Sequence, residues 1–160
     1  MTGIVAPQVL AADDQFARPA NETGSTAFAS SPMVTGGLTS QPIGHYEFCK
    51  TYIGEISKTG SDRGPMALTE PLWKEILEIN YTANSQITPL TDMEIYGVEE
   101  LWTYPRSVGD CEDFALLKRK MLIDRGVDPA DLLLTVVLQP NGEGHAVLTI
   151  RTDHGDFILD

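Results

Sequence analysis

The residues best suited to chemistry in this chain surround Cys111, in the acidic run from Gly109 to Asp113. Asp110 is a favourable N-cap residue and Gly126 stands where a C-terminal glycine is expected, so a helix is predicted to begin at Cys111. The apolar residues of this helix recur at helical spacing, at Phe114, Ala115, Leu117, Met121 and Leu122. Free backbone N–H groups and the positive dipole end of a helix favour thiolate over thiol. Cys111 is therefore a candidate nucleophile.

The alternative for Cys111 is a small buried apolar residue, a common use of an unpaired cysteine. Charged residues on both sides make an apolar environment unfavourable at this position. A thiolate nucleophile also needs a base, so a histidine on a neighbouring element is the next requirement.

Strands that can carry such a base are predicted after the helix. Residues 132–138 form a nearly continuous apolar run, the pattern of a strand buried on both faces. Residues 140–144 form a turn by composition. The run from His145 to Arg151 alternates, and a last short strand over residues 157–159 ends on Asp160.

A helix-borne cysteine, a strand-borne histidine and an aspartate on the next strand are the three parts of a cysteine nucleophile triad. Side chains alternate across a strand. His145 and Asp160 therefore share a face only if paired residue numbers in their hairpin sum to an odd value. We expect an odd register, which would place the carboxylate beside the imidazole.

These motifs resemble the bacterial transglutaminase-like cysteine peptidases, a family with periplasmic members. The resemblance is carried by Gly-Asp-Cys-Glu-Asp-Phe at 109–114, Gly-Glu-Gly-His-Ala-Val-Leu at 142–148 and the closing Phe-Ile-Leu-Asp at 157–160. It extends upstream through residues 40–49 and 96–105, and covers about residues 32 to 160.

The resemblance implies an α+β fold of the papain/transglutaminase type, with the catalytic cysteine at a helix N-terminus packed on an antiparallel sheet that carries the histidine and aspartate. It implies a polypeptide substrate, periplasmic localisation and a regulatory membrane-protein partner. The catalytic residues that it implies are Cys111, His145 and Asp160. It also links the carboxylates around the cysteine to calcium, which here are Asp110, Glu112 and Asp113.

The chemistry of these acids supports a calcium site. Carboxylates are hard oxygen ligands that suit calcium better than zinc, and structural zinc usually has paired Cys or His ligands at short spacings, which this sequence lacks. Three anions within one turn of the thiol would raise its pKa, and a bound divalent cation would reverse that effect. In the alternative interpretation, the acids only cap the helix and compensate its dipole.

Length and composition indicate one folded domain. The chain has 160 residues, 42% of them hydrophobic, enough for a single core. A net charge of -12 and a pI near 4.5 argue against nucleic acid or an anionic membrane as partner. No apolar stretch approaches the ~20 residues needed to span a membrane. With Cys111 in the site, no structural disulfide is expected, and Cys49 should pack as a small hydrophobe.

The beginning of the chain resembles a processed leader. Residues 9–13 resemble the small-residue cleavage site of a secretory signal, although the basic n-region is absent and an ordinary disordered terminus is the alternative. Residues 1–38 are therefore predicted to be a signal-peptide remnant and mobile leader, and residues 39–160 the peptidase domain. Family chains continue past the triad aspartate, so two alternatives are open: this chain is a truncated product, or C-terminal strands that should cover the site are missing after Asp160.

Other elements should support the site. An amphipathic helix starting near Thr69 should cover the core with one face, which includes Leu77. A short segment begins near Pro89 and runs to Gly97. Trp102 either packs in the core or lines the mouth of the site.

The function predicted from the sequence is that of a calcium-dependent cysteine endopeptidase acting on an exported or surface protein. Cys111 would attack a peptide carbonyl, His145 would transfer protons and Asp160 would orient the imidazole. Two alternatives remain open at this point: a protein transglutaminase or acyl transferase with the same triad, and a catalytically silent calcium-binding adaptor.

Overall fold

The computed structural model of the protein describes residues 32–34, 36–56 and 60–160. The predicted signal-peptide remnant and most of the predicted leader lie outside the described residues. The helices are α1 (Ile43–Thr51), α2 (Ile53–Ile56), α3 (Glu70–Gln86), α4 (Asp92–Tyr96) and α5 (Cys111–Asp124), together with the 3-10 turn η2 (Pro129–Asp131). The strands are β1 (Thr88–Pro89), β2 (Val108–Gly109), β3 (Leu132–Leu138), β4 (Gly144–Thr152) and β5 (Gly155–Leu159).

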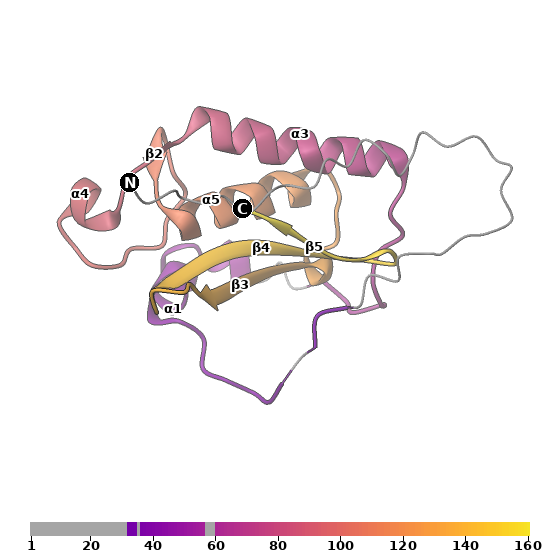
Figure 1. Ribbon diagram of the computed structural model, residues 1–160, viewed down its shortest axis with the longest axis horizontal. Coiled ribbons are helices and arrows are strands. Elements are labelled where there is room, and N and C mark those ends of the chain that lie inside the picture. The colour runs from indigo at the N-terminus through magenta and orange to yellow at the C-terminus, as the bar shows by residue number, and fades with distance from the viewer. Residues whose placement is uncertain (1–31, 35, 57–59) are drawn as a thin grey trace, which may run out of the picture.

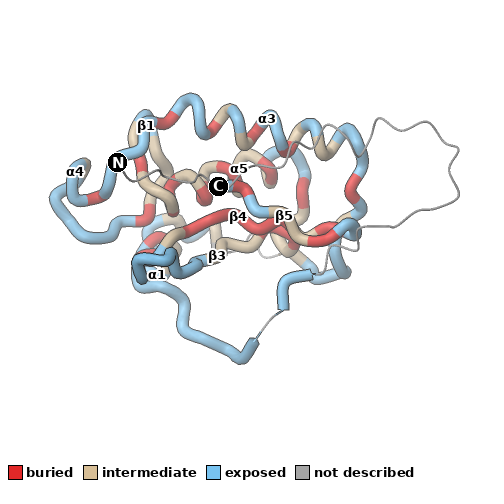
Figure 2. The backbone as a smooth tube through the Cα atoms, viewed as in Figure 1, coloured by how far each residue is buried: buried red, intermediate tan, exposed pale blue. Residues whose placement is uncertain are grey.

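The main core lies between an antiparallel sheet and two long helices. The sheet has the order β3-β4-β5, and α3 and α5 lie together over one of its faces (Figure 1). Apolar side chains from these helices and strands meet there, including Ile76, Leu122, Leu132, Leu148 and Leu159. Figure 2 shows buried residues along β4 and α5. The predicted mixture of helices and sheet is confirmed, and no helix in the described ranges has the length and apolar character to cross a membrane.

The two core helices begin where their sequence indicates. α5 starts at Cys111 and ends before Gly126, whose φ of 93° is in the left-handed region that suits glycine. α3 starts after Thr69, whose side chain accepts a hydrogen bond from the backbone N–H of Leu72. The prediction that Leu77 lies on the core-facing side of α3 is wrong, because 42% of its surface is exposed.

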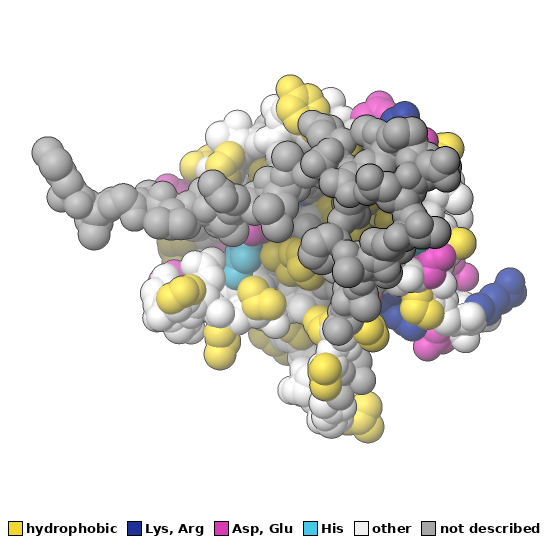
Figure 3. Space-filling view, turned by 45° about the vertical axis from the view of Figure 1, so that its right-hand side comes forward, with side chains coloured by type: hydrophobic (Ala, Val, Ile, Leu, Met, Phe, Trp, Pro, Cys, Tyr) yellow, Lys and Arg dark blue, Asp and Glu magenta, His cyan; other side chains and the backbone are white. Residues whose placement is uncertain are grey.

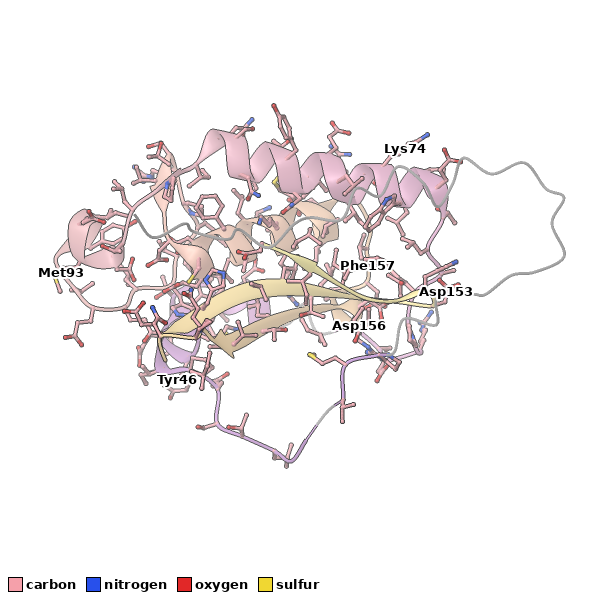
Figure 4. All side chains as sticks on the ribbon, viewed as in Figure 1. Tyr46, Lys74, Met93, Asp153, Asp156 and Phe157 are labelled. Atoms are coloured by element: carbon pink, nitrogen blue, oxygen red, sulfur yellow. The ribbon has the colours of Figure 1, made fainter. Side chains whose placement is uncertain are left out.

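The inner and outer faces of α3 are distinct in Figure 4. Lys74 projects outward from the helix, and its ammonium pairs with Glu70. Phe157 of β5 lies on the inner side, with its ring centroid 4.7 Å from that of Trp73. This aromatic contact holds β5, which leads to Asp160, against α3.

The burial of two strands differs from the expectation. The prediction that β3 is buried on both faces is wrong, because Val136, Val137 and Leu138 are 48%, 41% and 79% exposed. β3 is an edge strand, so its apolar run has too few neighbours to cover it. The alternating strand β4 is central, and Val147 and Thr149 on its second face are buried. Position in the sheet, more than the apolar pattern, determines burial here.

A second apolar cluster joins α1 to the segment that precedes α5. Phe48 of α1 packs with Trp102 and Leu116, and Cys49 lies beside them as a free thiol. Trp102 is 5% exposed, so the structure supports its core role rather than a place at the mouth of the site. His45 packs edge-on against the indole, with ring centroids 5.4 Å apart.

Gly44 permits the close approach of α1 to Trp102. A Cβ at Gly44 would lie 2.2 Å from Cδ1 of the indole, which is buried and cannot easily move. We expect Gly44→Ala to lower the free energy of unfolding by about 1–3 kcal/mol, the usual cost of overpacking, as measured by urea denaturation.

Gly54→Ala in α2 is the matched control, because an added Cβ there meets no atom within 4 Å. It should be neutral or stabilising, since alanine favours a helix over glycine. Equal destabilisation by the two substitutions would contradict the steric explanation.

Candidate active site

Cys111 is the first residue of α5, and its sulfur lies against the beginning of β4. The backbone N–H of Ala146 donates to Sγ at 3.4 Å, and the thiol donates to Oε2 of Glu112 at 3.0 Å. Since α5 packs along β4, the helix–sheet contact sets this position. The start of α5 thereby presents the thiol to the strand that carries His145.

His145 is paired with Asp160. Its Nε2 lies 2.8 Å from Oδ1 of the aspartate. Leu148 of β4 pairs with Leu159 of β5, so paired residue numbers in this hairpin add up to an odd value. The predicted odd register is confirmed. Asp160, which directly follows β5, therefore falls on the same face as His145. Asn84 of α3 donates to the backbone oxygen of Asp160 at 3.1 Å and ties the end of β5 to that helix.

The three predicted triad residues line one cavity of about 500 Å³. Because Nε2 of His145 is bonded to Asp160, Nδ1 is the ring nitrogen available to take the thiol proton. In the described residues, the Cys111 thiol is hydrogen-bonded to Glu112 and not to the imidazole. Figure 3 shows a histidine that reaches the surface beside acidic and apolar side chains. Apolar residues form much of the cavity wall, among them Pro89, Leu90, Phe114, Ala115 and Leu159.

The second thiol of the chain has different surroundings. Cys49 lies 3.7 Å from Nε2 of His45, and Nδ1 of His45 lies 3.1 Å from the side-chain oxygen of Gln41. In this Cys49–His45–Gln41 arrangement, the group beside the imidazole is an amide, whereas His145 has the Asp160 carboxylate beside it. Burial lowers the pKa of His45, which makes it a weaker base.

A cluster of three carboxylates lies at the start of α5. Asp92, Asp110 and Asp113 each offer an oxygen within 4.8 Å of the others. Asp92 and Asp113 are buried, and one oxygen of each of the three acids is buried with no hydrogen-bond partner. Asp110 occupies the N-cap position, but its side chain makes no capping hydrogen bond. This donor set is of the kind that hard cations such as calcium bind.

Backbone N–H groups hold the other carboxylate oxygen of each buried acid, Asp92 and Asp113. Leu101 donates to Asp92, and Thr103 donates to Asp113 at 2.9 Å. Both donors belong to the segment that α1 packs against through Phe48 and Trp102, and the hydroxyl of Tyr52, which follows α1, lies 3.1 Å from that of Thr103. The backbone thus fixes one oxygen of each buried acid and leaves another unpartnered.

The composition of this cluster differs from the predicted set. Asp110 and Asp113 are brought together as expected, whereas Glu112 turns to the thiol of Cys111. Asp92 joins the cluster, and no local motif in the sequence marks it for that role. It approaches because β1 and β2 pair in parallel with Pro89 opposite Gly109, so the segments after both strands leave in the same direction.

Burial dominates the titration of the cluster. It raises the pKa of Asp110 to about 7, with Glu112 adding to the effect, and it raises the pKa of Asp113 to about 7 although the Thr103 N–H opposes it. The pKa of Asp92 is also raised by burial. Ionisation of these three buried, closely spaced acids is therefore unfavourable.

The thiol does not have the lowered pKa that the helix start predicts. Burial raises the pKa of Cys111 to about 12, the Ala146 N–H opposes this effect, and Glu112 and Asp110 add to it. The direction is the one that the neighbouring carboxylates predict, and it is opposite to the one that the helix start alone predicts. Desolvation and two neighbouring anions outweigh the helix dipole and the hydrogen-bond donor.

These carboxylates should make the stability of the metal-free protein depend on pH. The pKa values of Asp110 and Asp113 exceed the ordinary 3.8, so the folded state binds more protons than the unfolded chain between about pH 4 and 7. This stabilisation is fully present below about pH 4 and is lost as pH rises through about 7. In EGTA, we expect the Tm to fall from about pH 5 to about pH 8.

Asp113→Asn should flatten this fall, because an amide does not ionise. Glu99→Gln, which changes an exposed acid, is the control and should leave the slope unchanged. A Tm independent of pH in the unsubstituted protein would contradict the raised pKa values.

No curated protein matches the sequence significantly. A family model does match: that of the bacterial transglutaminase-like cysteine proteinases, over residues 35–160. The matched part includes the described helices and strands, the cavity and the acidic cluster. The chain therefore belongs to the bacterial transglutaminase-like cysteine proteinases, and it is a cysteine peptidase.

Proposed function

We propose that this peptidase is a calcium-dependent endopeptidase in which Cys111 is the nucleophile, His145 the base and Asp160 the orienting carboxylate. The observation that carries the proposal is the shared cavity. Within it, the thiol touches the N–H of Ala146, and the neighbouring imidazole is bonded to Asp160. These groups supply what nucleophilic attack on a peptide requires.

In the proposed reaction, the Cys111 thiol gives its proton to Nδ1 of His145, and the sulfur attacks the carbonyl carbon of the substrate. The imidazolium then protonates the leaving amine, the C–N bond breaks, and a thioester to Cys111 remains. A water that gives a proton to His145 hydrolyses the thioester, releases the acid product and regenerates the thiol. Asp160 holds Nε2 throughout these steps.

The start of α5 supplies the electrophilic assistance. The first N–H groups of a helix have no partner within the helix, so they can donate to a developing oxyanion. The N–H of Cys111 is the candidate donor closest to the nucleophile. The residue that begins the helix would thus provide both the sulfur and one oxyanion contact.

Asp92, Asp110 and Asp113 are the proposed calcium ligands, because their unpartnered oxygens fit a hard cation. Calcium bound there would offset the anions that raise the thiol pKa. Glu112 then has a separate role as the acceptor of the thiol hydrogen bond, so it must release the thiol before the proton can pass to His145.

We propose an exported or surface protein as the substrate and the periplasm as the place of action. The resemblance of residues 9–13 to a signal cleavage site supports this location, and these residues lie outside the described part of the chain. Fractionation of cells that express the full-length protein tests the location directly.

Substitutions of the triad test the catalytic roles. We expect Cys111→Ala and His145→Ala to abolish peptide cleavage, and Asp160→Asn to reduce kcat by about 10²- to 10⁴-fold through loss of imidazole orientation. Cys49→Ala is the matched control, because that thiol lacks a carboxylate-bound histidine, and it should retain activity. Retained activity in Cys111→Ala would overturn the assignment.

The same assay separates the alternative functions. Purified protein is incubated with candidate exported proteins, with and without a primary amine, and the products are identified by mass spectrometry. An endopeptidase gives internal cleavage, whereas a transglutaminase or acyl transferase incorporates the amine at an acyl group. Absence of both reactions with calcium present would favour the calcium-binding adaptor.

Calcium dependence has its own test. We expect EGTA to suppress cleavage sharply, calcium to restore it, and magnesium to restore it poorly because magnesium demands tighter octahedral geometry. Asp92→Asn should weaken calcium binding measured by titration calorimetry, whereas Glu99→Gln should not. Full activity in excess EGTA, with all three acids intact, would contradict the proposed site.

A further inference from the structure

Lys118 is a buried cation on the catalytic helix that the proposed reaction does not use. It lies two helical turns after Cys111, so both side chains are on the same face of α5. Lys118 is 1% exposed, and it lines the cavity that Cys111, His145 and Asp160 also line. It therefore belongs to the site by position, not only by sequence.

The ammonium of Lys118 is poorly compensated. Among the described residues, the Lys118 ammonium contacts the ring of Phe114, with 5.8 Å between Nζ and the ring centroid, and it donates no hydrogen bond and forms no ion pair within 4 Å. Burial lowers the pKa of Lys118 to about 8, while the attraction of the Asp160 carboxylate raises it. A buried charge without a hydrogen bond costs stability, so a purely structural role would be better served by an apolar side chain of similar length.

Asp160 is the group that most needs such a cation. It follows the end of β5, and its side chain is 59% exposed, with one carboxylate oxygen bonded to His145. Asn84 fixes the backbone oxygen of Asp160 but not its carboxylate. Among the described residues, His145 supplies the one hydrogen bond to this carboxylate, so a cation in the same cavity would add a second constraint on it.

The geometry points to Lys118 as a positioning residue: its ammonium, buried in the cavity that Asp160 also lines, attracts the Asp160 carboxylate and favours its place beside His145. The inference rests on the proposed triad and deepens it. The titratable groups around the cavity come from several elements, with Asp110 and Cys111 at the start of α5, Glu94 on α4, His145 on β4 and Asp160 after β5. The Asp160 carboxylate belongs to the proposed triad and shares this cavity with Lys118, and its charge raises the pKa of the ammonium.

A double-mutant cycle tests this inference. We expect Lys118→Met to lower kcat about tenfold with KM nearly unchanged, and to add little further loss in the Asp160→Asn background, because coupled residues are not additive. Lys118→Arg, which retains the charge, should restore part of the loss. Lys120→Met on the exposed side of α5 is the control and should leave kcat unchanged. The Tm of Lys118→Met should equal or exceed that of the unsubstituted protein.

If the fold-losses in kcat of Lys118→Met and Asp160→Asn multiply in the double variant, the two residues act independently and the inference is overturned. A rise in KM alone would also overturn it, by showing that Lys118 contacts substrate, and a lowered Tm with intact kcat would show a structural role. A readout independent of activity is the ¹⁵N resonance of the Lys118 ammonium, which should shift on Asp160→Asn. An unchanged resonance would refute the pairing even if Lys118→Met failed to fold. If instead the resonance shifts but Cys111→Ala cleaves normally, the triad fails and the pairing stands.

Discussion

The contact between the start of α5 and the start of β4 is the constraint on which the rest of the site depends. It brings Sγ of Cys111 to the N–H of Ala146, one residue from the imidazole of His145. Helix and strand are each held by the core beneath, where Leu122 and Leu148 are completely buried. Packing that stabilises the fold therefore also fixes the distance between the nucleophile and its base. Substitutions deep in this core should act on catalysis through that distance.

A second constraint is electrostatic, and it opposes the first. The parallel pairing of β1 with β2 brings Asp92 to Asp110, and the backbone N–H of Thr103 holds Asp113 beside them. Burial, with the neighbouring carboxylates adding to it, raises the pKa values of Asp110, Asp113 and the Cys111 thiol, so these groups favour their protonated, unreactive forms. A hard cation bound to these acids would lower their pKa values and that of the thiol together, because it would offset several unfavourable interactions at once.

The sequence predicted local features well and long-range ones poorly. The helix that begins at Cys111, the hairpin register that aligns His145 with Asp160 and the pairing of Asp110 with Asp113 follow from periodicity, alternation and spacing. Asp92 could not be predicted, because only the pairing of two very short strands places it. The acidic run predicts that the pKa of Cys111 is raised, but not that burial is the largest cause, because desolvation depends on what the complete fold packs over the thiol.

The catalytic helix thus carries unfavourable charge in two places, its first turn and Lys118. Its first turn concentrates carboxylates, and two turns later it buries the ammonium of Lys118. Neither feature improves folding, since unpaired buried charges destabilise a protein. Both become useful if each is compensated by a group that the reaction needs, a cation at the carboxylates and the Asp160 carboxylate at the lysine. The charges of α5 would then hold a cation and the Asp160 carboxylate in place near the thiol. The protein gives up some stability there and gains the positioning of its catalytic groups.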